Sequence, residues 1–219
     1  EQALNSIPDI IVSDIMMPVM NGITMCKILK EDVRTSHIPI ILLTAKDSLQ
    51  DKEEGYQVGA DSYLTKPFSA TLLHSRINNL LESRKRLTER FNTSTPHHNM
   101  DEKRALLAES LNKLDNEFIE KINQLIEARL SSEKIDIGYL ADNMCMSKST
   151  LYRKMKALTG LSTNEYVRKI KMQHAERLLL EGRYNISEVA FRVGINSVVY
   201  FRQCFKEEFG VLPSEYLKQ

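Results

Sequence analysis

The sequence is poor in the residues that build disulfide frameworks and metal clusters. It has three cysteines in 219 residues, Cys26, Cys145 and Cys204, and they lie far apart along the chain. A disulfide scaffold or a zinc site needs several cysteines or histidines at short spacings, so neither is predicted. A few scattered cysteines are typical of a protein in a reducing compartment, which favours a cytoplasmic location.

Long apolar runs and a strong net charge are also missing. No apolar stretch approaches the ~20 residues that a membrane-spanning helix needs. The net charge is only +1, so the chain as a whole lacks the basic balance of many nucleic-acid-binding proteins. The charge is uneven, however, because residues 136–219 hold 13 Lys and Arg against 9 Asp and Glu. This asymmetry fits a basic C-terminal domain that binds nucleic acid, joined to a more acidic N-terminal part.

The C-terminal part of the sequence contains an internal repeat. Residues 147–166 match residues 197–216 at an offset of 50, and residues 137–144 match residues 186–193 at an offset of 49. One turn therefore has one residue more than the other. Each copy combines an apolar i, i+3, i+4, i+7 stripe with a turn, a serine cap and a second apolar stripe, which predicts helix-turn-helix. Cys145 stands where the second copy has Gly194, so the first turn is predicted to be built differently.

A helix-turn-helix unit places its second helix in the major groove of DNA. Residues 163–180 predict a connecting helix about 27 Å long at 1.5 Å per residue. This is close to the ~34 Å between successive major grooves on one face of a duplex. An arginine side chain can bond to guanine and a valine can contact a thymine methyl group. The predicted DNA-binding residues are Lys148, Ser149, Tyr152 and Arg153 in the first unit and Ser197, Val198, Val199, Arg202 and Gln203 in the second.

Residues 115–219 resemble the DNA-binding domain of AraC/XylS-type transcription regulators. The resemblance lies in the run from Ile186 to Gly194, in Ser197, in the run from Tyr200 to Lys206, and in residues 210–216. It implies an all-α domain with two helix-turn-helix units that binds double-stranded DNA. The sequence departs from the family at Ile195, where an aromatic residue is common, and at Val198 and Val199, where many members have polar residues.

The first part of the chain alternates short apolar runs with helical patterns. Residues 9–13, 38–43 and 62–64 predict strands. Residues 47–58 predict a helix, and so does a stretch from Ser69 through Leu81 that continues toward Phe91. Such alternation is typical of a parallel sheet, which binds ligands at the carboxyl ends of its strands. Asp14, Thr44 and Lys66 each follow a predicted strand, so we expect them at one edge.

This part resembles the receiver domain of two-component response regulators, on the motifs Asp14 to Pro18 with Gly22, Leu43-Thr-Ala45, Gly59-Ala-Asp61 and Lys66-Pro-Phe68. The resemblance implies that Asp14 accepts a phosphoryl group from a histidine kinase. It implies that Thr44 bonds to the phosphate, that Lys66 pairs with its charge, and that Tyr63 rotates with Thr44. It also implies a cis Lys66–Pro67 bond and Mg²⁺, for which Asp14 and the backbone carbonyl of Met16 are candidate ligands.

The sequence departs from the receiver pattern at its start. Only about eight residues precede the Asp14 strand, so the first two strands, the first helix and the acidic Mg²⁺-binding pair of the family are expected to be absent. Mg²⁺ is therefore expected in an intact receiver but not in this chain. The exposed edge at residues 9–13 predicts pairing with another chain, or partial disorder or rearrangement of residues 1–80.

The predicted fold is a truncated α/β receiver plus an all-α double helix-turn-helix domain. The predicted boundaries are residues 1–82 for the partial receiver, 83–114 for a linker and 115–219 for the DNA-binding domain. Asp115 is predicted to cap a helix over residues 117–130. The domain order resembles the cytoplasmic end of Bacteroides-type hybrid two-component regulators. That implies a histidine kinase on the same polypeptide and an inner-membrane anchor elsewhere in the full-length protein.

The sequence thus predicts a DNA-binding transcription regulator controlled by aspartyl phosphorylation, which is not itself an enzyme. Its predicted partners are double-stranded DNA, a histidine kinase domain and a second copy of the chain, and no membrane contact is predicted for this part. The alternative is a phosphorelay protein whose helical half mediates protein contacts.

Overall fold

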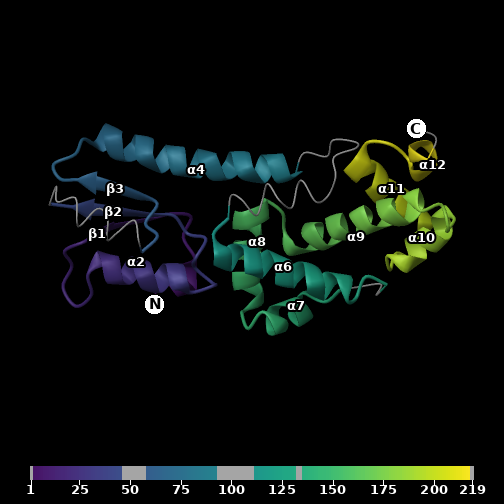
Figure 1. Cartoon of the computed structure of the whole chain (residues 1–219), viewed down its shortest axis with the longest axis horizontal. Helices are drawn as coiled ribbons and strands as arrows, with labels where there is room; N and C mark the ends of the chain where they lie inside the picture. Colours follow the sequence, from purple (N-terminus) through teal and green to yellow (C-terminus); the bar gives the residue numbers. More distant parts are fainter. Residues whose placement is uncertain (1, 46–57, 93–110, 132–134, 218–219) are drawn as a thin grey trace.

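The computed structural model describes residues 2–45, 58–92, 111–131 and 135–217. It has two halves, with the strands and the first helices at one end and a group of helices at the other (Figure 1). The N-terminal half contains α1 (Gln2–Ser6), β1 (Ile11–Asp14), α2 (Gly22–Glu31), β2 (Ile40–Thr44), β3 (Ser62–Thr65) and α4 (Ala70–Asn92). The predicted helix over residues 47–58 lies almost wholly outside the described residues.

The strands form a parallel sheet in the order β1-β2-β3, which confirms the predicted α/β class. Asp14 pairs in register with Leu43, and Thr44 pairs with Thr65, so the carboxyl ends of the strands are aligned. The central strand is the most buried, with Ile40, Ile41 and Leu42 fully inaccessible. Among the described residues β1 pairs on one side only. Pairing of its open edge with another chain remains a prediction.

Helix α4 runs from Ala70 to Asn92, which confirms the predicted continuation of this helix toward Phe91. The continuation lies within the predicted linker, residues 83–114. The helix extends from the sheet toward the helical half (Figure 1) and packs against a helix of that half, α8 (Lys148–Thr159). The two halves are therefore in contact through α4.

The C-terminal half is entirely helical in the part that the structure describes. Besides α8 it contains α6 (Lys113–Glu127), α7 (Ile137–Asn143), α9 (Thr163–Leu180), α10 (Ile186–Arg192), α11 (Val198–Phe209) and α12 (Pro213–Tyr216). α6 begins earlier than predicted, because Asn112 and not Asp115 is its N-cap. The amide N–H of Asp115 donates to the side-chain oxygen of Asn112 at 2.9 Å, so Asp115 lies inside the first turn.

Two hydrophobic cores in this half are joined by α9. Tyr166, Val167 and Ile170 of α9 belong to the first core, and Met172 and Ala175 belong to the second. Because α9 is buried in both cores, the two helix-turn-helix units are held on one continuous element. This confirms the predicted connecting helix over residues 163–180.

The two helix-turn-helix turns share a left-handed residue at the same place, so the prediction that Cys145 changes the first turn was wrong, whereas the predicted difference of one residue in length is present. Cys145 adopts a left-handed conformation with φ 53°, and Gly194 has φ 66°. The amide N–H of Met146 donates to the carbonyl of Ala141 at 3.0 Å, and the equivalent bond from Ile195 is 2.9 Å. The additional residue of the second unit is Asn196, just before its next helix begins. In the first turn a non-glycine residue, Cys145, adopts the left-handed conformation, which is strained for any residue with a Cβ atom.

Candidate phosphoacceptor and DNA-binding sites

The carboxyl ends of the three strands bring together the predicted phosphate-site residues. Lys66 forms an ion pair with the Asp14 carboxylate, which also accepts the Met16 amide N–H at 3.2 Å. The backbone N–H of Lys66 donates to the Thr44 carbonyl at 2.7 Å, so Thr44 adjoins this pair. Tyr63 is partly buried and packs against the hydrophobic core of this half. The Lys66–Pro67 peptide bond is cis, as the resemblance implied.

The charge of Asp14 is stabilised by its surroundings. The hydrogen bond from Lys66 lowers the pKa of Asp14, against a smaller opposing effect of desolvation. An ionised, half-exposed carboxylate can attack a phosphorus atom, and an adjacent ammonium can neutralise the charge of the product. The site therefore has the nucleophile and the cation that an acyl phosphate needs.

Gly22 fixes the shape of this site. Its backbone N–H donates to the Ile15 carbonyl at 2.9 Å, at the start of α2. A Cβ atom on Gly22 would lie 2.3 Å from the carbonyl oxygen of Asp14, well inside contact distance. Only glycine lets the helix start approach the acceptor strand this closely.

The predicted Mg²⁺ ligands at this edge are the Asp14 carboxylate, which pairs with Lys66, and the backbone carbonyl of Met16. Mg²⁺ requires octahedral oxygen coordination, in which one or two carboxylates are joined by waters and carbonyls. Over the described ranges, no group of three or more His, Cys, Asp or Glu side chains is arranged to hold a metal ion.

In each helix-turn-helix unit the second helix is the one expected to enter the DNA groove. We call α8 the first reader helix and α11 the second reader helix. Their serine caps are equivalent, since Ser147 accepts the Thr150 amide N–H and Ser197 accepts that of Tyr200. Both helices end at a left-handed glycine. The repeat in the sequence thus produces two matching helices with matching ends.

Most of the predicted DNA-binding side chains are exposed. In the first reader helix Tyr152 is 49% exposed, and in the second Val199 is 78% exposed. Val198 is an exception, because it packs against the second core. Tyr200, which the sequence reasoning missed, is 49% exposed one residue further along. The other predicted side chains that lie at the surface are Lys148, Ser149, Arg153, Ser197, Arg202 and Gln203.

Arg153 differs from the other predicted DNA-binding residues in its contacts. Its guanidinium donates to the carbonyls of Asn5 at 3.0 Å and Ser6 at 2.9 Å, both at the end of α1. The next residue, Lys154, is fully buried and pairs with Asp115. The sequence reasoning did not identify this buried pair, although Lys154 follows Leu151 at i+3 and so lies on the core-facing stripe.

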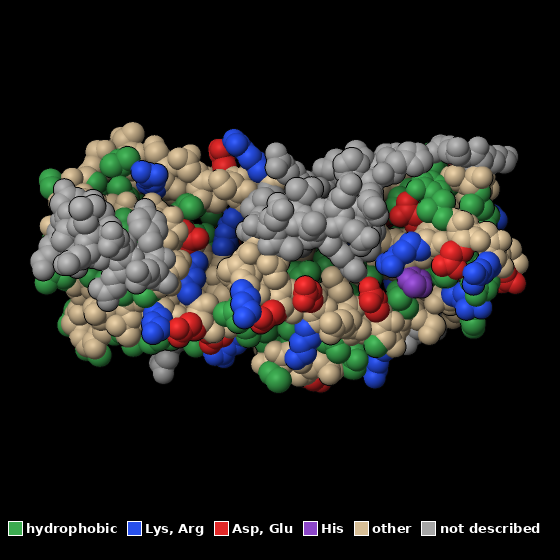
Figure 2. All heavy atoms as spheres, viewed as in Figure 1, with side chains coloured by type: hydrophobic (Ala, Val, Ile, Leu, Met, Phe, Trp, Pro, Cys, Tyr) green, Lys and Arg blue, Asp and Glu red, His purple; other side chains and the backbone are tan. Residues whose placement is uncertain are grey.

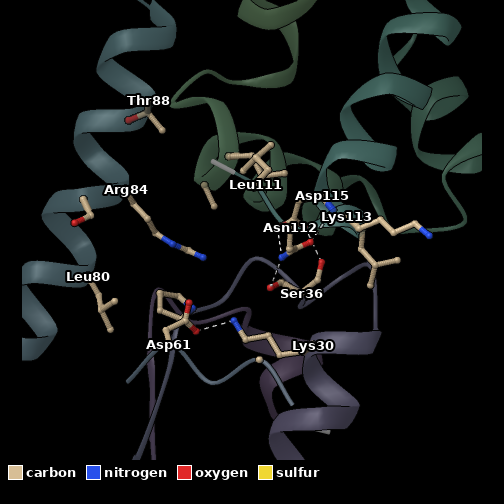
Figure 3. A pocket seen from close by; sticks show the side chains of 16 residues that line it. Lys30, Ser36, Asp61, Leu80, Arg84, Thr88, Leu111, Asn112, Lys113 and Asp115 are labelled. Carbon is tan, nitrogen blue, oxygen red and sulfur yellow. Dashed lines mark hydrogen bonds and ion pairs between the residues drawn. The ribbon is translucent and has the colours of Figure 1, made fainter. Parts of the chain in front are cut away.

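Ser36 connects the two halves at this buried pair. Its hydroxyl donates to Asp115 at 2.7 Å and its carbonyl accepts from Asn112 at 3.2 Å (Figure 3). The same hydroxyl accepts from Lys154 at 3.0 Å. We call Ser36, Asn112, Asp115 and Lys154 the interface cluster. Burial lowers the pKa of Lys154, and Asp115 opposes that shift. The cluster joins the loop before β2 to α6 and α8.

A cavity of about 630 Å³ lies beside the interface cluster, between α4 and the start of α6. Arg84 points into it from α4, and the Lys30–Asp61 ion pair forms part of its wall (Figure 3). On the face of the molecule shown in Figure 2, basic and acidic side chains are interspersed rather than gathered in one patch. Charge alone therefore does not mark the DNA-binding surface on that face.

Comparisons with known proteins divide the chain in the same way. Residues 1–78 match the response regulator receiver domain family, and residues 140–219 match the helix-turn-helix domain family. The chain is 36% identical over 214 residues to Histidine kinase P4 of Formosa agariphila, across 98% of this chain and 15% of that protein. It is 45% identical over 78 residues to the response regulator PleD of Caulobacter vibrioides, across 36% of this chain and 17% of that protein.

A solved structure resembles the helical half. The C-terminal domain of AraT, a response regulator from Geobacillus stearothermophilus, is 31% identical, with a TM-score of 0.43. The match covers 46% of this chain and 84% of that one. The chain spans less than a fifth of the length of the two curated relatives named above. No helix among the described residues is long and apolar enough to cross a membrane.

Proposed function

The chain joins a response regulator receiver domain to an AraC-type helix-turn-helix domain, and from this premise we propose that it is a sequence-specific transcription regulator controlled by phosphorylation of Asp14. The observation that carries the proposal is the doubled reader helix on a single buried connector, α9. Two readers fixed on one helix can enter successive major grooves on one face of the duplex.

The second reader helix presents a mixed surface for base recognition. Arg202 can form two hydrogen bonds to a guanine, and Val199 can contact a thymine methyl group. The backbone N–H groups in the first turn of a reader helix point toward its N-terminal end, where phosphate oxygens can bind. On such a surface a few side chains recognise the base sequence, and contacts to the DNA backbone fix the position of the protein on the duplex.

In the proposed signalling step an oxygen of the Asp14 carboxylate attacks the phosphorus atom of a phosphohistidine on a kinase domain. A P–O bond forms, the P–N bond breaks, and the imidazole leaves with the electron pair of that bond. Lys66 then pairs with the phosphoryl group instead of with the free carboxylate. The likeness over 98% of this chain to part of a protein named as a histidine kinase supports a kinase on the same polypeptide.

DNA binding is tested by selecting duplexes from a random pool with the chain and then measuring the affinity of the selected site. Arg202→Ala should cost about 1–3 kcal/mol at a site that contains the contacted guanine. Arg183→Ala, which removes an exposed arginine from the turn before α10, is the matched control and should cost much less. If no duplex is enriched above the pool, the proposed function is wrong.

The acceptor role is tested separately with acetyl phosphate and Mg²⁺. Asp14→Asn should abolish any labelling of the chain. We expect weak labelling of the unaltered chain, since the described residues offer Mg²⁺ few oxygen donors. Strong labelling that survives Asp14→Asn would place the acceptor elsewhere.

A further inference from the structure

The cavity beside the interface cluster has the size and position of a small-molecule site. Its wall combines Lys30 and Asp61 with Leu80 and Arg84 of α4 and with the first turn of α6. Its volume is about 630 Å³, and ligand sites of about 300–1,000 Å³ occur preferentially where domains meet. Gly59 in the wall is exposed, so the cavity reaches the surface and a ligand can enter.

Arg84 brings a cation into this cavity. Its side chain points into the space between the elements (Figure 3), and it makes no hydrogen bond or ion pair with the residues that the structure describes. Burial lowers the pKa of Arg84, and the carboxylates of Asp61 and Asp115 oppose that shift only in part. Because an arginine stays protonated in proteins, a charge is withdrawn from water here without a neighbouring anion. An anion that enters the cavity would supply the missing partner.

The other charged groups around the cavity are already matched. The ammonium group of Lys30 lies 2.7 Å from the Asp61 carboxylate. Asp115 pairs with Lys154 in the interface cluster. The side chain of Lys113 is 90% exposed and extends away from the cavity (Figure 3). Among the described residues of the wall, the guanidinium of α4 is therefore the charge left unbalanced, and a ligand with one negative charge would neutralise it.

Most of the remaining wall is apolar. Leu80, Leu111 and Leu114 are partly buried there, and Pro39 and Leu158 are buried. Burial of apolar ligand surface against such side chains favours binding. An apolar wall with a convergent charged group is typical of sites for small organic molecules, in which the charged group fixes the orientation of the ligand.

We propose that this cavity binds a small organic monocarboxylate with an apolar body. The two carboxylate oxygens accept hydrogen bonds from the Arg84 guanidinium, whose planar fork fits a carboxylate. The body of the ligand lies against Leu80, Leu111 and Leu158. One negative charge balances Arg84, whereas a phosphate group of nearly two charges would leave negative charge in excess. The inference goes beyond the proposed function, because it requires neither DNA nor phosphorylation of Asp14.

The probe for the first test is cyclohexylacetate, which joins a carboxylate to an apolar ring. Isothermal titration calorimetry on the whole chain should show saturable binding at a single site. Cyclohexylacetamide has the same shape without the charge, and acetate has the charge without the ring. We expect each of these two molecules to bind at least about tenfold more weakly, since each keeps only one of the two interactions.

The variant Arg84→Gln tests the cation. It removes the guanidinium and should weaken binding of cyclohexylacetate about tenfold, because hydrogen bonds to a charged group are lost. Its affinity for cyclohexylacetamide should stay nearly the same. Arg86→Gln is the matched control, at a side chain of α4 that is 77% exposed and pairs with Glu82 away from the cavity wall. This control should leave the affinity for both probes unchanged.

A second pair of variants tests the apolar wall. Leu80→Phe places a larger ring in the cavity and should weaken binding of cyclohexylacetate and cyclohexylacetamide alike. Leu81→Phe, at the neighbouring side chain that is 36% exposed, should have no such effect. Far-UV circular dichroism and urea unfolding establish which variants are folded. If Arg84→Gln does not fold, this second pair decides the inference.

Three results would each overturn the inference. They are the absence of saturable cyclohexylacetate binding by the unaltered chain, equal affinity of Arg84→Gln and Arg86→Gln for that probe, and equal affinity of the unaltered chain for the charged and the neutral probe. All three concern this cavity, so the proposed function, which is tested by selection of duplexes, would stand. Failure of the chain to enrich a duplex would in turn leave the carboxylate site untouched.

Discussion

At the scale of single residues, Lys154 and its neighbour Arg153 show how differently two adjacent basic side chains can be used. Arg153 is at the surface and contacts α1, whereas Lys154 is fully buried beside Asp115. Replacing Lys154 by methionine would leave the Asp115 carboxylate buried without its cation. We expect Lys154→Met to lower the free energy of unfolding by about 3–5 kcal/mol.

The control for this prediction is the double variant Lys154→Met with Asp115→Leu. Removing both charges together avoids the unpaired carboxylate, so the double variant should be clearly more stable than Lys154→Met alone. Urea unfolding followed by circular dichroism measures all three proteins. A loss below about 1 kcal/mol in the single variant would contradict the buried pair.

His37, next to Ser36, predicts a pH dependence of stability. Burial lowers its pKa from the ordinary 6.5 to about 2, and Lys154 and Arg84 add to the shift. Its Nδ1 atom is buried without a hydrogen-bond partner. Below pH 6.5 the His37 side chain therefore binds a proton in the unfolded chain but not in the folded chain. Stability should fall as pH decreases from 6.5 toward 2, by about 1.4 kcal/mol per pH unit from this residue.

This contribution is measured by comparing unfolding free energies at pH 7 and pH 5 in His37→Gln and in the unaltered chain. The variant should lose less stability over that interval, because its side chain does not titrate. His74→Gln, at an exposed position of α4, is the control and should retain the pH dependence of the unaltered chain. Equal losses in all three proteins would show that His37 is protonated in the folded state.

At the scale of elements, the turn between α7 and α8 carries strain that its counterpart avoids. Cys145 has φ 53° where the second turn has glycine. A left-handed non-glycine residue costs roughly 1–2 kcal/mol, and glycine costs roughly 0.5–1 kcal/mol in chain entropy. Cys145→Gly should therefore stabilise the chain by about 0.5–1 kcal/mol in thermal or urea unfolding. Cys145→Ala keeps a Cβ atom and should give no such gain, so equal stabilisation by both would remove strain as the cause.

The helices and strands were predictable to the extent that each rests on a local pattern. The repeat predicted α7 to α11 because apolar stripes, serine caps and closing glycines recur at fixed spacing. The shared left-handed conformation of Cys145 and Gly194 was missed because glycine is the residue usually expected at positive φ, and here a cysteine adopts it. Asn112 was missed as the cap of α6 because Asp115 is an equally good capping residue by type. Asp115 is buried because Lys154 of α8 packs against it. This contact joins distant parts of the chain, so no local sequence pattern predicts it.

The grouping of the predicted phosphate-site residues at one sheet edge was predictable for a different reason. Parallel strands bring residues that follow them to one edge, so Asp14, Thr44 and Lys66 could be placed together from the order of strands alone. Contacts between the two halves could not be predicted from the sequence. Ser36 lies in a loop, and nothing in the sequence of that loop indicates a hydrogen bond to Asp115. The contact of Arg153 with α1 is likewise made through backbone carbonyls, which every sequence has.

At the scale of the whole molecule, both reader helices should contribute to how strongly salt weakens DNA binding. Each phosphate neutralised by the protein contributes ~0.9 to the slope of log K against log salt concentration. Lys148 at the start of the first reader helix is an exposed cation that can meet a phosphate. We therefore expect Lys148→Ala to make this slope shallower by about 1 than that of the unaltered chain. Binding to the selected duplex is measured between low and moderate salt, with Arg183→Ala as the reference. Parallel lines for Lys148→Ala and Arg183→Ala would mean that Lys148 meets no phosphate, and that the first reader helix does not lie against the DNA backbone at its start.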